Sequence, residues 1–329
     1  MFNKIYYIKK RPHKNEVNNI IYKKATPYFT TLYEVDQIKH FPIKINVEIY
    51  GNDKGIPVIY CHGGPGASID TLIPRLFNLS KYKLIMFDQR GCGKSTPLNH
   101  IEKNKTQYII DDMEYIRKQL NIDKWVVSGG SWGSSLAVIY AIQYPNVING
   151  IILRGFYDLT LNREVLDSMY PEVSGEIMEL LKLKPTTNSI KMLNKSFKFI
   201  MNKNKNNKTR KKIIELLSKS ETENLAGIQT PEPFKDKEST SILGSYYEMN
   251  HFFINKNYIY DNIYKIKHIP CYLIVGRYDI ITPPIMSYHI SKLMDHSTLY
   301  ITNSGHSIDE IENIKYFIKA TKNLLKQMI

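Results

Sequence analysis

The chain has 329 residues, of which 43% are hydrophobic and 23% are charged, enough to bury the core of one large α/β domain, with or without an insertion. It has no apolar run of about 18 residues, and its first residues show no apolar stretch followed by a small-residue cleavage site, so a soluble cytoplasmic protein is expected. The net charge of +14 comes largely from scattered lysines, and the basic run at 203–212 has no interleaved aromatic residues, which argues against nucleic-acid binding.

The first part of the chain is polar and weakly patterned until about residue 30. From there to residue 51 apolar and polar residues alternate, which predicts antiparallel edge strands. Two continuous apolar runs of strand length follow, at Ile56–Cys61 and at 83–88. Residues 106–120 then carry apolar side chains at helical spacing, on one face.

A short β-branched and aromatic run at 125–127 leads into residues 129–133, which read G-G-S-W-G, and then into small and apolar residues typical of a helix start. A strand that runs directly into a helix leaves room only for a sharp, strained turn, and glycines two positions either side of the serine relieve the crowding. G-x-S-x-G also occurs in ordinary Gly/Ser turns. Its position between a strand and a helix predicts Ser131 as an exposed nucleophile.

Further strands are expected at 147–155, 271–279 and 297–305, with helices after Pro284 and from Asp309 to the end of the chain. Nearly continuous apolar strands that alternate with helices predict a mostly parallel sheet covered by helices on both faces. Between about residues 160 and 251 only helical segments are recognisable, at 165–170, 176–183, 190–201 and 211–218, which predicts an inserted helical cap. The expected division is therefore 1–159 and 252–329 for the core and 160–251 for the cap.

A serine hydroxyl needs a base within hydrogen-bond reach, and that base needs a carboxylate to orient it. In the α/β-hydrolase fold the carboxylate and then the histidine follow the serine in the chain. Asp279 and His306 each directly follow an apolar strand, so both are expected at the sheet edge that carries Ser131. Alone, the aspartate would indicate a turn and the histidine a loop or cap; together they predict a triad. Asp295 and Asp309 are the alternative carboxylates.

Acyl transfer also needs hydrogen-bond donors for the oxyanion of the intermediate. One is expected from the backbone N–H of Trp132, directly after the nucleophile. The second is expected from the H-G-G-P-G loop, whose glycines allow a close approach; we select Gly64, with Gly63 as the alternative. His62, at the start of that loop, is assigned a structural role, and no spacing of metal ligands is present.

At this point the sequence resembles a known family, the proline iminopeptidases (prolyl aminopeptidases) of the α/β-hydrolase fold. The resemblance covers residues 42–155 and 245–307 and is carried, in order, by HGGPGAS, FDQRGCGKSTP, DKWVVSGGSWGSSLAVIYAIQYP, GIILRG, KIKHIPCYLIVGRYDIITP and SGHS. It implies that a serine nucleophile releases an N-terminal proline from a peptide, without a metal, under a helical cap. It also implies the same triad, Ser131, Asp279 and His306.

In the cap the chain departs from that family, whose members bind the substrate ammonium with acidic residues there. No acid is present at 193–204, where the first is expected. The second falls on Met249, so Glu248 is the candidate, one residue earlier and about 100° away around a helix. An exposed helix glutamate is the alternative interpretation. Four nearby aromatic residues could wall a proline pocket or belong to the core: Tyr246, Tyr247, Phe252 and Phe253.

The sequence thus predicts a cytoplasmic serine hydrolase, an aminopeptidase acting on short peptides with N-terminal proline. The alternatives are a carboxylesterase or other acyl hydrolase and, in a different class, a non-catalytic binding protein of the same fold. No cofactor, nucleic acid or membrane partner is expected. Three widely spaced cysteines predict no disulfide framework, and the oligomeric state is left open.

Overall fold

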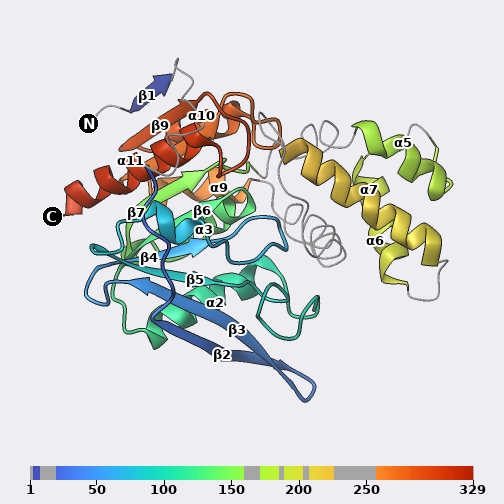
Figure 1. Cartoon of the computed structure of the whole chain (residues 1–329), viewed down its shortest axis with the longest axis horizontal. Coiled ribbons are helices and arrows are strands. Elements are labelled where there is room, and N and C mark those ends of the chain that lie inside the picture. The colour runs from blue at the N-terminus through green and yellow to red at the C-terminus, as the bar shows by residue number, and fades with distance from the viewer. Residues whose placement is uncertain are drawn as a thin grey trace.

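A computed structural model of the chain (Figure 1) describes residues 3–7, 20–158, 171–184, 189–202, 207–225 and 257–328. Its centre is a nine-stranded sheet with the order β1-β9-β8-β7-β6-β4-β5-β3-β2. The strands are β1 (Lys4–Tyr7), β2 (Phe29–Ile38), β3 (Phe41–Gly51), β4 (Ile56–Cys61), β5 (Tyr82–Phe87), β6 (Trp125–Gly130), β7 (Ile148–Arg154), β8 (Cys271–Gly276) and β9 (Ser297–Thr302). Among the described strands, only the pairs β2–β3 and β3–β5 are antiparallel, so the predicted mostly parallel sheet is confirmed.

The first strand is absent from the sequence prediction, which treated the start of the chain as weakly patterned. β1 lies parallel to β9 at the sheet edge, with Lys4 opposite Thr298 and Tyr7 opposite Ile301. The ring of Tyr6 stacks on that of Tyr300, with 5.3 Å between centroids. A strand of four residues whose partner lies near the other end of the chain leaves no periodic signal in its own neighbourhood.

Alternate residues of each central strand face opposite layers, which explains why the strands are continuously apolar. Ile59 and Cys61 point to the layer with α2 (Thr106–Gln119), α3 (Trp132–Gln143) and α10 (Pro284–Leu293). Val58 and Tyr60 point to the layer with α11 (Ile311–Met328) and the 3-10 turn η2 (Ile73–Leu76). Phe317 of α11 is fully buried, and each side chain of this size contributes about 1.5–3 kcal/mol on burial.

Three of the helical segments expected in the inserted region are described. They are α5 (Pro171–Leu180), α6 (Ser189–Met201) and α7 (Asn207–Leu225), which contact one another and lie together at one end of the molecule (Figure 1). The fourth expected segment, 165–170, lies outside the described residues, so the boundaries at 160 and 251 stay predictions. The chain returns through α9 (Tyr258–Asn262) and η4 (Ile263–Lys265), and η3 (Pro145–Val147) precedes β7. None of the described helices has the length and apolar character needed to cross a bilayer.

Candidate active site

Ser131 occupies the turn between β6 and α3, with φ 55° and ψ −129°. A residue with a side chain seldom adopts a positive φ, so this backbone is strained, as the sequence predicts for a strand that runs directly into a helix. Glycines make the turn possible. A Cβ on Gly129 would lie 2.1 Å from the carbonyl oxygen of Gly133, and a Cβ on Gly133 would lie 2.1 Å from that of Cys61. The Ser131 N–H donates to the carbonyl of Arg154 at 2.9 Å, which fixes the turn to β7.

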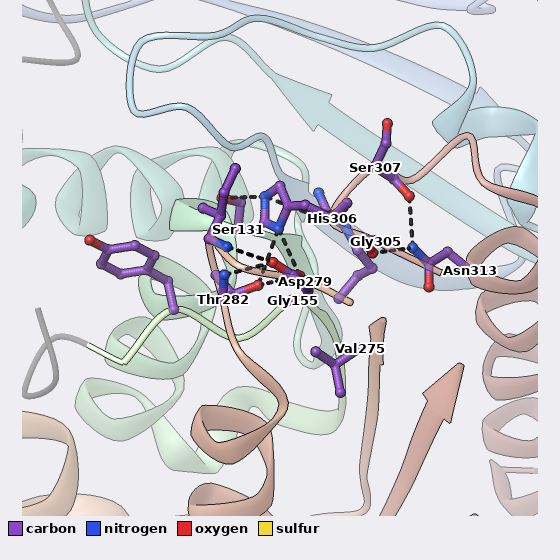
Figure 2. Close-up of polar contacts among 12 residues, drawn as sticks. Ser131, Gly155, Val275, Asp279, Thr282, Gly305, His306, Ser307 and Asn313 are labelled. Atoms are coloured by element: carbon purple, nitrogen blue, oxygen red, sulfur yellow. Dashed lines mark hydrogen bonds and ion pairs between the residues drawn. The ribbon is translucent and has the colours of Figure 1, made fainter. Parts of the chain in front are cut away.

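The three side chains of the predicted triad meet at this turn (Figure 2). The Nε2 atom of His306 lies 3.1 Å from Oγ of Ser131, and its Nδ1 atom lies 2.8 Å from Oδ2 of Asp279. The serine is 7% exposed, so it is buried rather than exposed as the sequence predicts, and the histidine and aspartate are each 3% exposed. They come from the carboxyl ends of β6, β8 and β9, so the parallel sheet gathers residues that are far apart in the chain.

The carboxylate of Asp279 is held by the loop that leads into α10. Its Oδ1 atom accepts the N–H groups of Ile281 at 3.0 Å and Thr282 at 2.7 Å, and Oδ2 accepts the Thr282 hydroxyl at 2.6 Å. Burial opposes ionisation, but the neighbouring His306 and these hydrogen bonds hold the pKa of Asp279 below its ordinary value. An ionised Asp279 accepts from Nδ1–H of the imidazole and leaves Nε2 free to accept a proton from the serine.

Sequence reasoning missed Arg154, whose guanidinium lies against the histidine. It ends β7 and is 8% exposed; its Nη1 atom donates to the His306 carbonyl at 2.6 Å and lies 3.4 Å from Nε2 of the imidazole. Burial lowers the pKa of His306, the charge of Arg154 lowers it further, and Asp279 only partly offsets them. The imidazole is therefore held in its neutral, proton-accepting form. The available signal was a basic residue at the end of a buried strand.

The loop expected to supply an oxyanion donor packs against the nucleophile turn. A Cβ on Gly63 would lie 3.2 Å from Cβ of Ser131, and Gly64 follows with a φ of 107° that favours glycine. Trp132 is the first residue of α3, so its backbone N–H belongs to the helix N-terminus, where amide groups lack intrahelical partners. The two predicted donor segments thus both adjoin Ser131, while the assignment of Gly64 and Trp132 as donors stays a prediction.

A glutamine from the D-Q-R-G motif joins those two segments, a role that sequence reasoning did not assign. Gln89 is fully buried, and its Nε2 atom donates to the His62 carbonyl at 2.8 Å. Its Oε1 atom accepts the indole N–H of Trp132 at 3.1 Å, and its backbone N–H donates to Nε2 of His62 at 3.0 Å. Burial lowers the pKa of His62, in line with a neutral ring that accepts this bond. Asp88, the preceding residue, accepts the N–H of Ile69 at 2.7 Å and so holds the same loop.

The two alternative carboxylates are not brought to the histidine. Asp295 forms a surface ion pair with Lys267 at 3.3 Å, beyond the opposite end of β9 from His306. Asp309 is exposed in the loop before α11, and Nδ1 of the histidine is occupied by Asp279. Glu248 and the four aromatic residues predicted near it lie outside the described residues. Among the residues that the structure does describe, no group of three His, Cys, Asp or Glu side chains could hold a metal ion.

The sequence of the chain matches a family model and several named proteins. The family model for the alpha/beta hydrolase fold matches residues 56–309. The chain is 33% identical to the "Putative proline iminopeptidase" of Mycoplasma genitalium, over 84% of this chain and 91% of that protein. It is 30% identical to the "Proline iminopeptidase" of Arabidopsis thaliana, over 91% of this chain and 81% of that protein.

Solved structures agree on the fold. The crystal structure of VinJ matches with a TM-score of 0.60 at 17% identity, over 92% of this chain and 100% of that one. The proline iminopeptidase of Mycobacterium smegmatis matches with a TM-score of 0.59 at 14% identity, over 91% and 98% of the two chains. At such low identity these likenesses establish the fold alone.

Proposed function

Because the chain belongs to the α/β-hydrolase fold family and to the proline iminopeptidases within it, we propose that it is a serine aminopeptidase that releases proline from the N-terminus of short peptides. One observation carries the proposal within that family. The imidazole of His306 lies between a serine on a strained turn and a buried carboxylate, 3.1 Å from Oγ of Ser131 and 2.8 Å from Oδ2 of Asp279. A neutral histidine so placed can take the serine proton.

In the proposed reaction Nε2 of His306 removes the Ser131 proton while Oγ attacks the carbonyl carbon of the N-terminal residue. The N–H groups of Gly64 and Trp132 stabilise the oxyanion, with each such donor contributing about 2.7–4 kcal/mol. The imidazolium, stabilised by Asp279, gives its proton to the leaving amine. Water, activated by the same histidine, then hydrolyses the prolyl-enzyme and releases proline.

The substrate ammonium needs a carboxylate partner once it is desolvated. We propose Glu248 for this role, with the cap limiting cleavage to one residue. Replacing it by glutamine removes the charge and keeps the shape. The Glu248→Gln variant should therefore raise KM for a proline amide far more than for an uncharged ester; an equal effect on both substrates would reject the assignment.

The reaction class is tested by assaying chromogenic proline amides beside simple esters, with Ser131→Ala as the control. An aminopeptidase hydrolyses the proline amide, and the variant does not. Hydrolysis of esters alone would move the chain to the carboxylesterases, which use the same triad. Failure of a fluorophosphonate probe to label Ser131 would instead favour the non-catalytic binding protein.

We also propose that the protein works in the cytoplasm. Its three cysteines, Cys61, Cys92 and Cys271, are buried as free thiols, and burial strongly raises the pKa of Cys61 and Cys271. Unpaired thiols fit a reducing compartment. Fractionation of cells that produce the protein should recover it with cytosolic markers, and recovery with secreted material would contradict the proposal.

A further inference from the structure

The loop that carries His306 is held from the first turn of α11. Asn313 is fully buried, and its Nδ2 atom donates to the carbonyl oxygens of Gly305 at 3.1 Å and of Ser307 at 2.7 Å (Figure 2). These carbonyls belong to the two residues on either side of the histidine. Arg154 donates to the carbonyl of His306 itself at 2.6 Å. Three successive carbonyls of the loop thus accept hydrogen bonds from buried side chains.

A second side chain from the same segment accepts a hydrogen bond from a backbone N–H group of the loop. Glu310 lies just before α11 and is 3% exposed, and its Oε2 atom accepts the N–H of Gly305 at 2.9 Å. Gly305 therefore has both its N–H and its carbonyl fixed by side chains. Glycine has the widest conformational freedom of any residue, so these two hydrogen bonds restrict the backbone directly before His306.

The orientation of the Asn313 amide is itself fixed. The hydroxyl oxygen of Thr302, the last residue of β9, lies 2.7 Å from Oδ1 of Asn313 and 3.2 Å from the carbonyl oxygen of Val275. The amide oxygen only accepts and the amide nitrogen only donates. By donating to the oxygen, the threonine turns the NH₂ group toward the two loop carbonyls.

We propose that Asn313, oriented by Thr302, is a positioning residue for the reaction: it fixes the backbone around His306 so that the imidazole stays between Asp279 and Ser131. The inference rests on the proposed roles of Ser131 as nucleophile and His306 as base. Proton transfer at 3.1 Å tolerates little displacement, since a misplacement of about 1 Å can lower a rate by about a hundredfold.

A purely structural role would have Asn313 tie α11 to the sheet and nothing more. The same helix offers a matched control for that role. Asn323 donates its Nδ2 to the hydroxyl of Tyr300 at 3.1 Å, which also joins α11 to β9 but does not touch the histidine loop. Replacing either asparagine by alanine removes side-chain amide hydrogen bonds from α11, but only one replacement loosens the loop.

The test measures the second-order rate at which a fluorophosphonate labels Ser131, well below the melting temperature of each variant. This reaction needs the serine and its base but no particular peptide substrate. Asn313→Ala should lower the rate by about tenfold or more, with kcat for a proline amide falling alike and KM little changed. Asn323→Ala should label at the wild-type rate.

The threonine supplies variants that disturb the core less, in case Asn313→Ala does not fold. Thr302→Val keeps the shape and removes the hydroxyl, so it should lower the labelling rate in the same direction. Thr302→Ser keeps the hydroxyl and should label at the wild-type rate. Folded Thr302→Val protein that labels at the wild-type rate would overturn the positioning role.

The outcome for the proposed function is separate. A wild-type protein that is not labelled at Ser131 would overturn both proposals. Labelling without proline release would reject the aminopeptidase alone, and the labelling rates of the variants would still decide the role of Asn313.

Discussion

The Gln89→Leu substitution is predicted to impair catalysis as well as stability. The glutamine side chain makes two buried hydrogen bonds, to the His62 carbonyl at 2.8 Å and from the Trp132 indole at 3.1 Å. Leucine has nearly the same volume but neither donates nor accepts, so it removes both hydrogen bonds. Removing one partner of a buried hydrogen bond costs about 1–3 kcal/mol, so the free energy of unfolding should fall by about 2–6 kcal/mol.

The catalytic effect follows from what the two partners carry. His62 begins the loop that holds Gly64, and Trp132 provides the other expected oxyanion donor. Loosening both should lower kcat by about tenfold to a hundredfold, less than the full loss of one donor, which costs about 10²–10³. KM should change little, since the oxyanion forms only along the reaction.

The assay pairs urea unfolding with steady-state kinetics on a proline amide. Gln107→Leu is the control, because that glutamine is exposed and its hydrogen bonds to Gln143 and Asp111 lie at the surface, so the unfolding free energy of this variant should stay within about 0.5 kcal/mol of the wild type. A Gln89→Leu protein that is destabilised but keeps its kcat would refute the link to the oxyanion donors. One that is not destabilised would refute the hydrogen bonds themselves.

Three further predictions concern the site and its supports. The lowered pKa of His306 should place the acid limb of kcat/KM below the ordinary histidine pKa of about 6.5, and Arg154→Met, which removes a nearby positive charge, should move that limb to higher pH in a pH–rate profile. Gly133→Ala should abolish activity and lower the melting temperature because its Cβ would meet backbone oxygen, whereas Gly150→Ala, which meets only side-chain ends, should be tolerated; equal melting temperatures would contradict this. Burial raises the pKa of Glu310, so its contribution to stability is full below the unfolded pKa and is lost as pH rises through the folded value; Glu310→Gln should flatten that decline in urea titrations across this range, and parallel curves would reject it.

The triad was within reach of sequence reasoning because it follows from topology. Ser131 and His306 are 175 positions apart, yet each directly follows an apolar strand that the local pattern reveals. In a parallel sheet the carboxyl ends of strands share one edge, so the contacts of His306 with Ser131 and Asp279 can be predicted from the order of the strands. The order serine, aspartate, histidine then limited the choice among the carboxylates.

The side chains that hold the triad were not predictable in this way. Gln89 acts on residues 27 positions before it and 43 after it, and Asn313 acts on a loop through one face of its helix. Buried polar residues of this kind interrupt the apolar pattern of the sequence, but the pattern does not indicate which groups they hydrogen-bond. Strand β1 was not predicted for the same reason: its partner, β9, is distant in the chain.

The proposed reaction passes through a proline ester of Ser131, and that species can be sought directly. A chromogenic proline amide is mixed with the protein, the reaction is quenched in acid within the first turnover, and the digested protein is mapped by mass spectrometry. The account predicts a prolyl group on the peptide that contains Ser131, absent from Ser131→Ala, together with loss of proline release in that variant. Proline release that persists in Ser131→Ala would contradict it.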